Sequence, residues 1–119
     1  MKIAVTGCTG FVGSALATGF AAAGATVIGL GHRTSPTKEV RSVLNGFEAA
    51  ALGDEAALRA FFGRYQPDAV IHCAAMANAP KCEVASMQAF ATNVIGTRNI
   101  AAALELVGNP TFVHLSTDM

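Results

Sequence analysis

The chain has 119 residues, of which 52% are hydrophobic and 13% charged, and its eight basic and eight acidic residues leave no net charge. This length allows one domain with a modest core, and the balanced charge suggests neither nucleic acid nor an anionic membrane as a partner. The apolar runs stop well short of the roughly 20 residues that a bilayer span needs, and Met1–Ile3 leads into a strand without a signal-peptide core. Cys8, Cys73 and Cys82 lack C-x-x-C spacing, which indicates reduced thiols rather than a disulfide or zinc site. We therefore expect a cytoplasmic protein without a metal.

The sequence pattern alternates between strands and helices along the whole chain. The expected elements are strand Lys2–Thr6, helix Phe11–Ala23, strand Ala25–Leu30, a short helix over Val40–Phe47, a weak strand Glu48–Leu52, a helix from the cap Asp54 through Tyr65, strand Ala69–Cys73, a long helix from about Glu83 to Val107, and strand Pro110–Ser116. Successive strand–helix units require right-handed crossovers, which give a parallel sheet with helices on both faces. The prediction is one α/β domain over residues 1–119, a doubly wound sheet in the order 3-2-1-4-5.

Two of these helices have a clear apolar face. The face consists of Val12, Leu16, Gly19 and Phe20 in the first helix, and of Leu58, Phe61, Phe62 and Tyr65 in the third. Gly24 is expected to end the first helix.

A glycine-rich turn, T-G-C-T-G-F-V-G over residues 6–13, connects the first strand to the first helix. Gly7 permits a sharp exit from the strand, Gly10 lets a phosphate approach the backbone, and Gly13 lets the helix settle against the sheet. The amides and the dipole of the new helix favour an anion at this end. The alternative is a glycine-rich turn that binds nothing. The pattern favours a dinucleotide site, whose expected cofactor residues here are Gly7, Thr9, Gly10, Phe11, Val12 and Gly13.

The spacing T-G-x-x-G-x-x-G resembles that of the extended short-chain dehydrogenase/reductase family, whose members act mostly on nucleotide-linked sugars. The run Ser116-Thr117-Asp118 after the last strand is most similar to the dTDP-4-dehydrorhamnose reductase-like branch. Together these landmarks extend the resemblance over essentially the whole chain. The resemblance implies a Rossmann domain, and it implies that Thr117 bonds the substrate carbonyl or alcohol beside the nicotinamide.

The cofactor's sugar end is expected to lie just past the second strand. NAD-preferring members of the family carry an acidic residue there, whereas this chain has Leu30-Gly31-His32-Arg33. A guanidinium without a carboxylate fits a 2′-phosphate, which arginine can bind bidentately. His32 and Arg33 therefore favour NADP, with NAD as the alternative cofactor. Arg33 could instead be an ordinary solvated loop charge.

The adenine end is expected near Leu52-Gly53-Asp54. The family has an acidic residue three positions before the cap of the following helix, and with Asp54 as the cap that position is Ala51. Asp54 is interpreted as a structural N-cap, although a different alignment would place it at the adenine. Leu52 is retained as a cofactor-binding residue.

The fourth strand and its turn, Pro67–Ala77, closely resemble the corresponding family segment. Ala74, Ala75 and Met76 are expected to leave room for the ribose and diphosphate to cross the backbone. His72 could be a general base, but in an apolar strand a hydrogen-bonded core histidine is favoured. Cys73 is interpreted as a small buried apolar residue.

The run N-V-I-G-T, residues 93–97, resembles a family element in the long helix. The amide of Asn93 would bond the neighbouring strand or the cofactor region, and Gly96 would permit close approach of helix and sheet. A solvated asparagine on an exposed face is the alternative.

The family's catalytic tyrosine, with a lysine four residues on, has no counterpart in the chain. The only tyrosine, Tyr65, is not followed by a lysine. One hypothesis is the NADP(H)-binding part of a sugar-nucleotide reductase or epimerase, truncated after the fifth strand and inactive alone. The other is a complete, non-catalytic nucleotide-binding module, since the same fold serves as a regulatory subunit in S-adenosylmethionine synthesis. Under the truncation hypothesis, the fifth strand is an exposed edge and the long helix loses neighbours, and we expect self-association through them.

Overall fold

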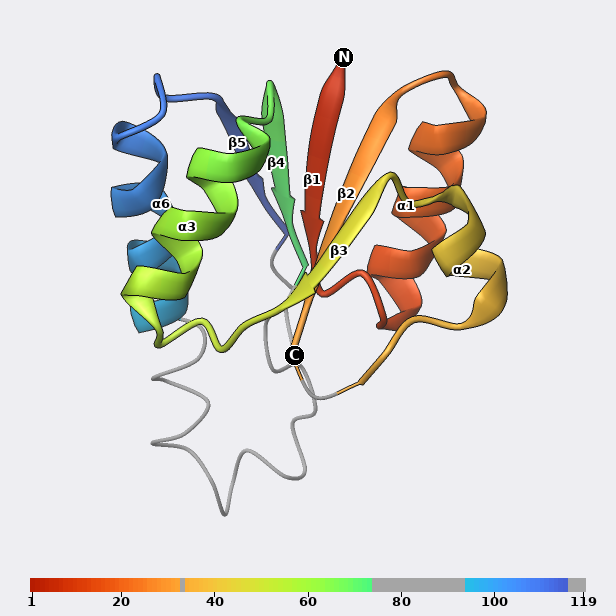
Figure 1. Cartoon of the computed structure of the whole chain (residues 1–119), viewed down its shortest axis with the longest axis horizontal. Helices are drawn as coiled ribbons and strands as arrows, with labels where there is room; N and C mark the ends of the chain where they lie inside the picture. Colours follow the sequence, from red (N-terminus) through yellow and green to blue (C-terminus); the bar gives the residue numbers. More distant parts are fainter. Residues whose placement is uncertain (33, 74–93, 116–119) are drawn as a thin grey trace.

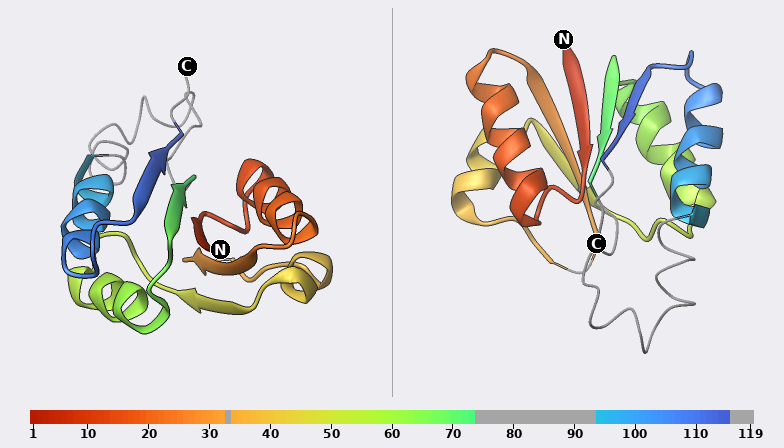
Figure 2. Two further views of the ribbon diagram at one scale, coloured as in Figure 1. Left: turned by 90° about the horizontal axis from the view of Figure 1, so that it is seen from above. Right: turned by 180° about the vertical axis from the view of Figure 1, so that it is seen from behind.

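The computed structural model describes residues 1–32, 34–73 and 94–115. The elements in chain order are β1 (Lys2–Thr6), α1 (Phe11–Ala22), β2 (Thr26–Gly31), α2 (Lys38–Val43), β3 (Gly46–Ala49), α3 (Glu55–Tyr65), β4 (Ala69–His72), α6 (Gly96–Glu105) and β5 (Thr111–His114). The five strands form one parallel sheet in the order β3-β2-β1-β4-β5, which confirms the predicted topology. Helices α1 and α2 lie on one face of the sheet, and α3 and α6 lie on the other (Figures 1 and 2).

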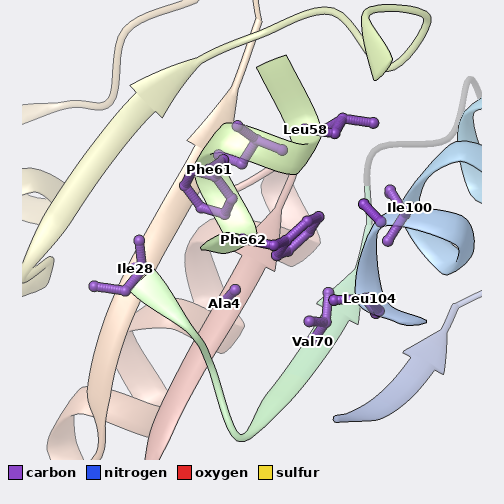
Figure 3. Packing of buried hydrophobic residues seen from close by; sticks show 10 residues of the cluster. Ala4, Ile28, Leu58, Phe61, Phe62, Val70, Ile100 and Leu104 are labelled. Carbon is purple, nitrogen blue, oxygen red and sulfur yellow. The ribbon is translucent and has the colours of Figure 1, made fainter. Parts of the chain in front are cut away.

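Two hydrophobic clusters, one on each face, hold the layers together. On the face of α3 and α6, the rings of Phe61 and Phe62 meet edge to face at 5.1 Å, and both are almost fully buried (Figure 3). This cluster comprises Ala4, Ile28, Leu30, Leu58, Phe61, Phe62, Val70, Ile100, Ala103 and Leu104. The predicted apolar face of α3 is therefore correct.

The face that α1 presents to the sheet differs from the prediction. Val12 is 50% exposed and Gly19 is exposed, whereas Gly13 and Ala17 are buried. Leu16 and Phe20 do pack against the second cluster, as expected, and this cluster comprises Ile3, Val5, Cys8, Ala17, Val27 and Ile71. Compared with the predicted face, the buried face of α1 is therefore shifted toward Gly13 and Ala17. Small residues allow the helix to lie close to the turn and the sheet, and a search for hydrophobic residues does not detect this.

The third strand begins earlier than predicted. Helix α2 ends at Val43, and Phe47 lies in β3 rather than in the second helix. Asn45 causes this change, because its side chain accepts a hydrogen bond from Val27 N–H (3.0 Å) and its own N–H donates to the Val27 carbonyl (2.7 Å). The chain is thereby fixed to β2 two residues before Phe47, which pairs with Gly29.

Several predicted boundaries are confirmed. Gly24 follows α1 with φ +95°, and Asp54 caps α3 by accepting a hydrogen bond from Ala57 N–H at 3.1 Å. The last strand is shorter than predicted, and the predicted long helix is described only from residue 94 onward, with α6 as its regular part. Within the described residues, no helix is long and apolar enough to cross a membrane.

Candidate dinucleotide-binding site

The turn from β1 to α1 is fixed by backbone hydrogen bonds. Gly7 adopts φ +68°, in the left-handed region that favours glycine. Its N–H donates to the Leu30 carbonyl on β2 at 2.8 Å, and its own carbonyl accepts from Gly10 N–H at 3.0 Å. The predicted sharp exit from the strand at Gly7 is confirmed, and the turn is attached to the neighbouring strand.

Gly13 is required by the close approach of α1 to this turn. A Cβ atom at Gly13 would lie 2.0 Å from the Gly7 carbonyl oxygen and 2.7 Å from its carbon. The sequence argument predicted the need for glycine correctly, but it placed the close contact at the sheet rather than at the turn. At Gly10, by contrast, a Cβ would lie 3.4 Å from the same oxygen, an ordinary contact.

Cys8 attaches the turn to the sheet, because its side chain packs against β2. Its side chain is fully buried, and a Cβ on Gly29 would lie 2.7 Å from its Sγ, so the missing side chain on β2 makes room for the sulfur. Burial raises the pKa of the Cys8 thiol to about 11, which keeps it protonated and unreactive near neutral pH. Sequence reasoning missed this pairing, because it joins positions 21 residues apart without a local pattern.

The start of α1 offers a positive helix end to an anion. Gly10 precedes the helix in an extended conformation, no side chain caps this end, and the first turn contains no acidic residue. Phe11 is 92% exposed, Val12 is half-exposed and Thr9 is partly buried in the turn. Helix amides without a capping side chain fit a phosphate group, and the turn is therefore suited to the diphosphate of a dinucleotide.

At the end of β2, His32 is exposed immediately after the strand. Its partner in the predicted 2′-phosphate site, Arg33, lies outside the described residues.

Leu52 lies in the loop after β3 and contacts helix α6. Its carbonyl accepts a hydrogen bond from Asn99 Nδ2 at 2.9 Å, and a Cβ on Gly96 would lie 2.8 Å from the Leu52 Cβ. Gly96 thus permits close approach of the helix to this loop rather than to the sheet. Asn99, which is buried in mid-helix, was missed by sequence reasoning, although asparagine in that position is itself a signal of a side-chain bond.

His72 is a buried, hydrogen-bonded histidine at the end of β4, as predicted. Its Nδ1 lies 2.6 Å from Thr6 Oγ1 on β1, and its Nε2 lies 3.1 Å from Thr97 Oγ1. Burial, with a smaller effect of the positive charge that His114 can carry, lowers the pKa of His72 to about 4. The ring is therefore neutral at physiological pH and has no solvent access, which argues against a role as general base.

Cys73, directly after β4, is partly buried rather than fully buried. Its N–H donates to Thr6 Oγ1 at 3.1 Å and to the Thr6 carbonyl at 3.2 Å. Burial raises the pKa of its thiol. Both Cys8 and Cys73 are free thiols. Across the described ranges, no three His, Cys, Asp or Glu side chains gather in a way that could hold a metal ion.

The structure brings together only part of the predicted site. The glycine turn, Thr9, Phe11, Val12 and His32 lie near the carboxyl ends of β1 and β2. Leu52 is described but lies against α6. Six other predicted site residues lie outside the described residues, and these are Arg33, Ala74, Ala75, Met76, Asn93 and Thr117.

A doubly wound parallel sheet with a tight glycine turn between its first strand and helix is the architecture of a Rossmann-type dinucleotide-binding domain. Residues 3–119 match the NAD dependent epimerase/dehydratase family, and the chain belongs to this family.

The relatives are enzymes and biosynthetic proteins of greater length. The probable polysaccharide biosynthesis protein EpsC of Bacillus subtilis is 31% identical over 126 residues, covering 98% of this chain and 21% of that protein. The dTDP-4-dehydrorhamnose reductase of Mycolicibacterium smegmatis is 35% identical over 117 residues, covering 98% and 30% respectively. Among solved structures, the UDP-glucose 4-epimerase of Thermotoga maritima with UDP-glucose gives a TM-score of 0.88 at 28% identity, covering 98% of this chain and 38% of that one. The chain thus spans well under half the length of these proteins.

Proposed function

We propose that the chain is the NADP(H)-binding part of a nucleotide-sugar reductase or epimerase, of the dTDP-4-dehydrorhamnose reductase type. The glycine turn carries this proposal, because Gly7, Gly10 and Gly13 leave the start of α1 open to a diphosphate without a capping side chain. The names of the relatives support a nucleotide-linked sugar as the substrate. The alternative of a regulatory module is supported by the similarity to the methionine adenosyltransferase 2 subunit beta of Xenopus laevis, which is 30% identical over 114 residues, covering 96% of this chain and 31% of that protein.

The bound nicotinamide would supply or accept the hydride. The chain's own contribution is to hold the diphosphate at α1, to bind the 2′-phosphate through His32 and Arg33, and to orient the substrate oxygen through Thr117. An acid–base group is not provided by Tyr65, because its ring packs 5.1 Å from Phe61 in the core and also lies against Gly46. We therefore do not assign the proton transfer to Tyr65.

Calorimetric titration with NADPH and NADH tests cofactor binding. Gly10→Ala is the decisive variant, because its methyl group would lie 3.4 Å from the Gly7 oxygen, an ordinary contact, and under our proposal it would hinder the approach of the diphosphate to the backbone. We expect unchanged stability and at least tenfold weaker binding. Gly19→Ala, whose added Cβ meets no atom within 4 Å, is the matched control for binding and should bind like the wild type. The absence of saturable dinucleotide binding to the folded wild-type chain would refute the proposal.

The cofactor preference has its own test. Arg33→Gln should weaken NADPH binding while leaving NADH binding unchanged, because the guanidinium would act only on the 2′-phosphate. An equal loss for both cofactors, or no loss for either, would contradict the NADP assignment. If the intact protein from its host binds NADPH but oxidises none of it with dTDP-4-keto sugars, the regulatory alternative replaces the reductase.

A further inference from the structure

His72 connects three elements at the edge of the sheet where the cofactor would bind. Thr6 is the last residue of β1 and directly precedes Gly7, His72 is the last residue of β4, and Thr97 lies in the first turn of α6. The imidazole bonds both threonines, and Thr6 Oγ1 also accepts from Cys73 N–H. The ring therefore fixes the relative positions of two strand ends and one helix.

The bond between Thr6 and His72 crosses the switch point of the sheet. In the order β3-β2-β1-β4-β5, the chain proceeds outward from β1 through β2 and β3, and then returns to place β4 on the other side of β1. Dinucleotides bind outside the carboxyl ends of the strands at such a point. The glycine turn begins directly after Thr6 at the end of β1, and β4 ends at His72, which pairs with Thr6 on the neighbouring strand.

The hydrogen bonds assign one protonation state to the ring. Thr6 Oγ1 accepts a hydrogen bond from Cys73 N–H and still has its own hydroxyl proton to donate; we assign that proton to His72 Nδ1, which is then the acceptor. Nε2–H then donates to Thr97 Oγ1. A doubly protonated ring would oppose the Thr6 hydroxyl, and the low pKa of His72 agrees with this assignment.

The described residues that contact the His72 ring are compatible with its neutral form. From β5, His114 stacks on His72 with ring centroids 5.1 Å apart, and Phe112 lies at 6.1 Å. The described contacts from β1 and α6 to the ring are both made by threonines. His114 is the one titratable group among these contacts, and its positive charge would oppose, rather than stabilise, protonation of His72.

We propose that His72 is a positioning residue for the dinucleotide, which acts through Thr6 to hold the glycine turn and the end of β4 at the spacing the diphosphate requires. This inference rests on the proposed cofactor function. His72 does not touch the cofactor, and its effect is on the geometry of the turn.

Four variants test this inference through NADPH affinity, measured by calorimetry on protein shown to be folded by circular dichroism. His72→Leu removes both hydrogen bonds and should weaken binding about tenfold, whereas His72→Asn, whose Oδ1 can still accept from Thr6, should bind within about threefold of wild type; tenfold corresponds to about 1.4 kcal/mol. Thr6→Val removes only the hydroxyl and should reproduce the loss even if His72→Leu does not fold. His114→Asn is the matched control and should bind like the wild type.

The outcomes separate the two proposals. Wild-type affinity in folded His72→Leu or Thr6→Val would overturn the positioning role while leaving the cofactor function intact. Failure of the wild-type chain to bind any dinucleotide would refute the proposed function and this inference with it. Nitrogen-15 NMR of the imidazole provides a second measurement, in which a proton on Nδ1 rather than on Nε2 would overturn the assigned hydrogen-bond direction.

Discussion

Replacing Gly13 with alanine should destabilise the chain strongly, although alanine is the better helix former. The added Cβ would lie 2.0 Å from the Gly7 carbonyl oxygen, whereas carbon and oxygen normally approach to about 3.3 Å, so the two backbones must separate by about 1.3 Å. Neither side yields easily, because Gly7 is hydrogen-bonded to Leu30 and Gly10.

The magnitude follows from three opposing contributions. Overpacking against an unyielding neighbour costs up to about 3 kcal/mol, and weakening one hydrogen bond of the turn costs about 1 kcal/mol. The helix preference of alanine over glycine offsets about 1 kcal/mol. The expected net loss is about 3 kcal/mol, a large part of the roughly 5 to 15 kcal/mol by which a domain is stable.

Urea unfolding followed by circular dichroism measures this loss. Gly19→Ala in the same helix is the control, because no atom lies within 4 Å of its added Cβ, and it should raise the free energy of unfolding by up to about 1 kcal/mol. Equal unfolding midpoints for Gly13→Ala and Gly19→Ala would show that α1 does not approach the turn as closely as described.

Three further predictions concern pH, capping and the contact of α6. The pKa of His72 is about 4 in the folded chain and near 6.5 in the unfolded chain, so the unfolded state binds the proton first as the pH falls. The free energy of unfolding therefore has its full value from His72 above pH 6.5 and decreases by up to about 3 kcal/mol as the pH falls toward 4. Urea unfolding from pH 4.5 to 7.5 should show this slope in the wild type, and a His72→Asn variant with an equal slope would contradict it. Asp54→Ala should lose about 1 kcal/mol of unfolding free energy while Asp54→Asn retains most of it, and equal losses in thermal unfolding would argue against the cap. Gly96→Ala should lose about 1 to 3 kcal/mol in urea unfolding because its Cβ would meet Leu52 at 2.8 Å, unlike Gly63→Ala in α3, which meets no atom within 4 Å; similar values for both would refute the contact.

Local sequence patterns were sufficient for the strand order and for the glycine turn. The apolar strands, the face of α3 and the positions of Gly7 and Gly24 depend on neighbouring residues, and each was confirmed. The start of β3 was not predicted, because it depends on hydrogen bonds between Asn45 and Val27, which are 18 residues apart.

The site shows the same division between local and long-range causes. Gly13 could be predicted from its spacing, but its contact partner could not, since the folded path of the turn decides that Gly7 lies beneath it. The hydrogen bond from Asn99 to the Leu52 carbonyl likewise joins residues 47 positions apart. His72 was expected to be a bonded core histidine, whereas its two threonine partners follow only from the tertiary arrangement.

The fit of Cys8 into the space left by Gly29 places a constraint on any redesign of the glycine turn. The sizes of the residues at positions 8 and 29 are coupled, because the Cys8 sulfur occupies the space that a side chain at position 29 on β2 would take. A library that varies residue 8 alone can sample only side chains no larger than a thiol. Alanine at position 8 would remove the sulfur that an alanine at position 29 would meet. The new Cβ at position 29 would still lie 3.0 Å from Leu44 Cδ1 and 3.3 Å from Phe47 Cδ1, so a redesign of the turn must also let these two side chains shift.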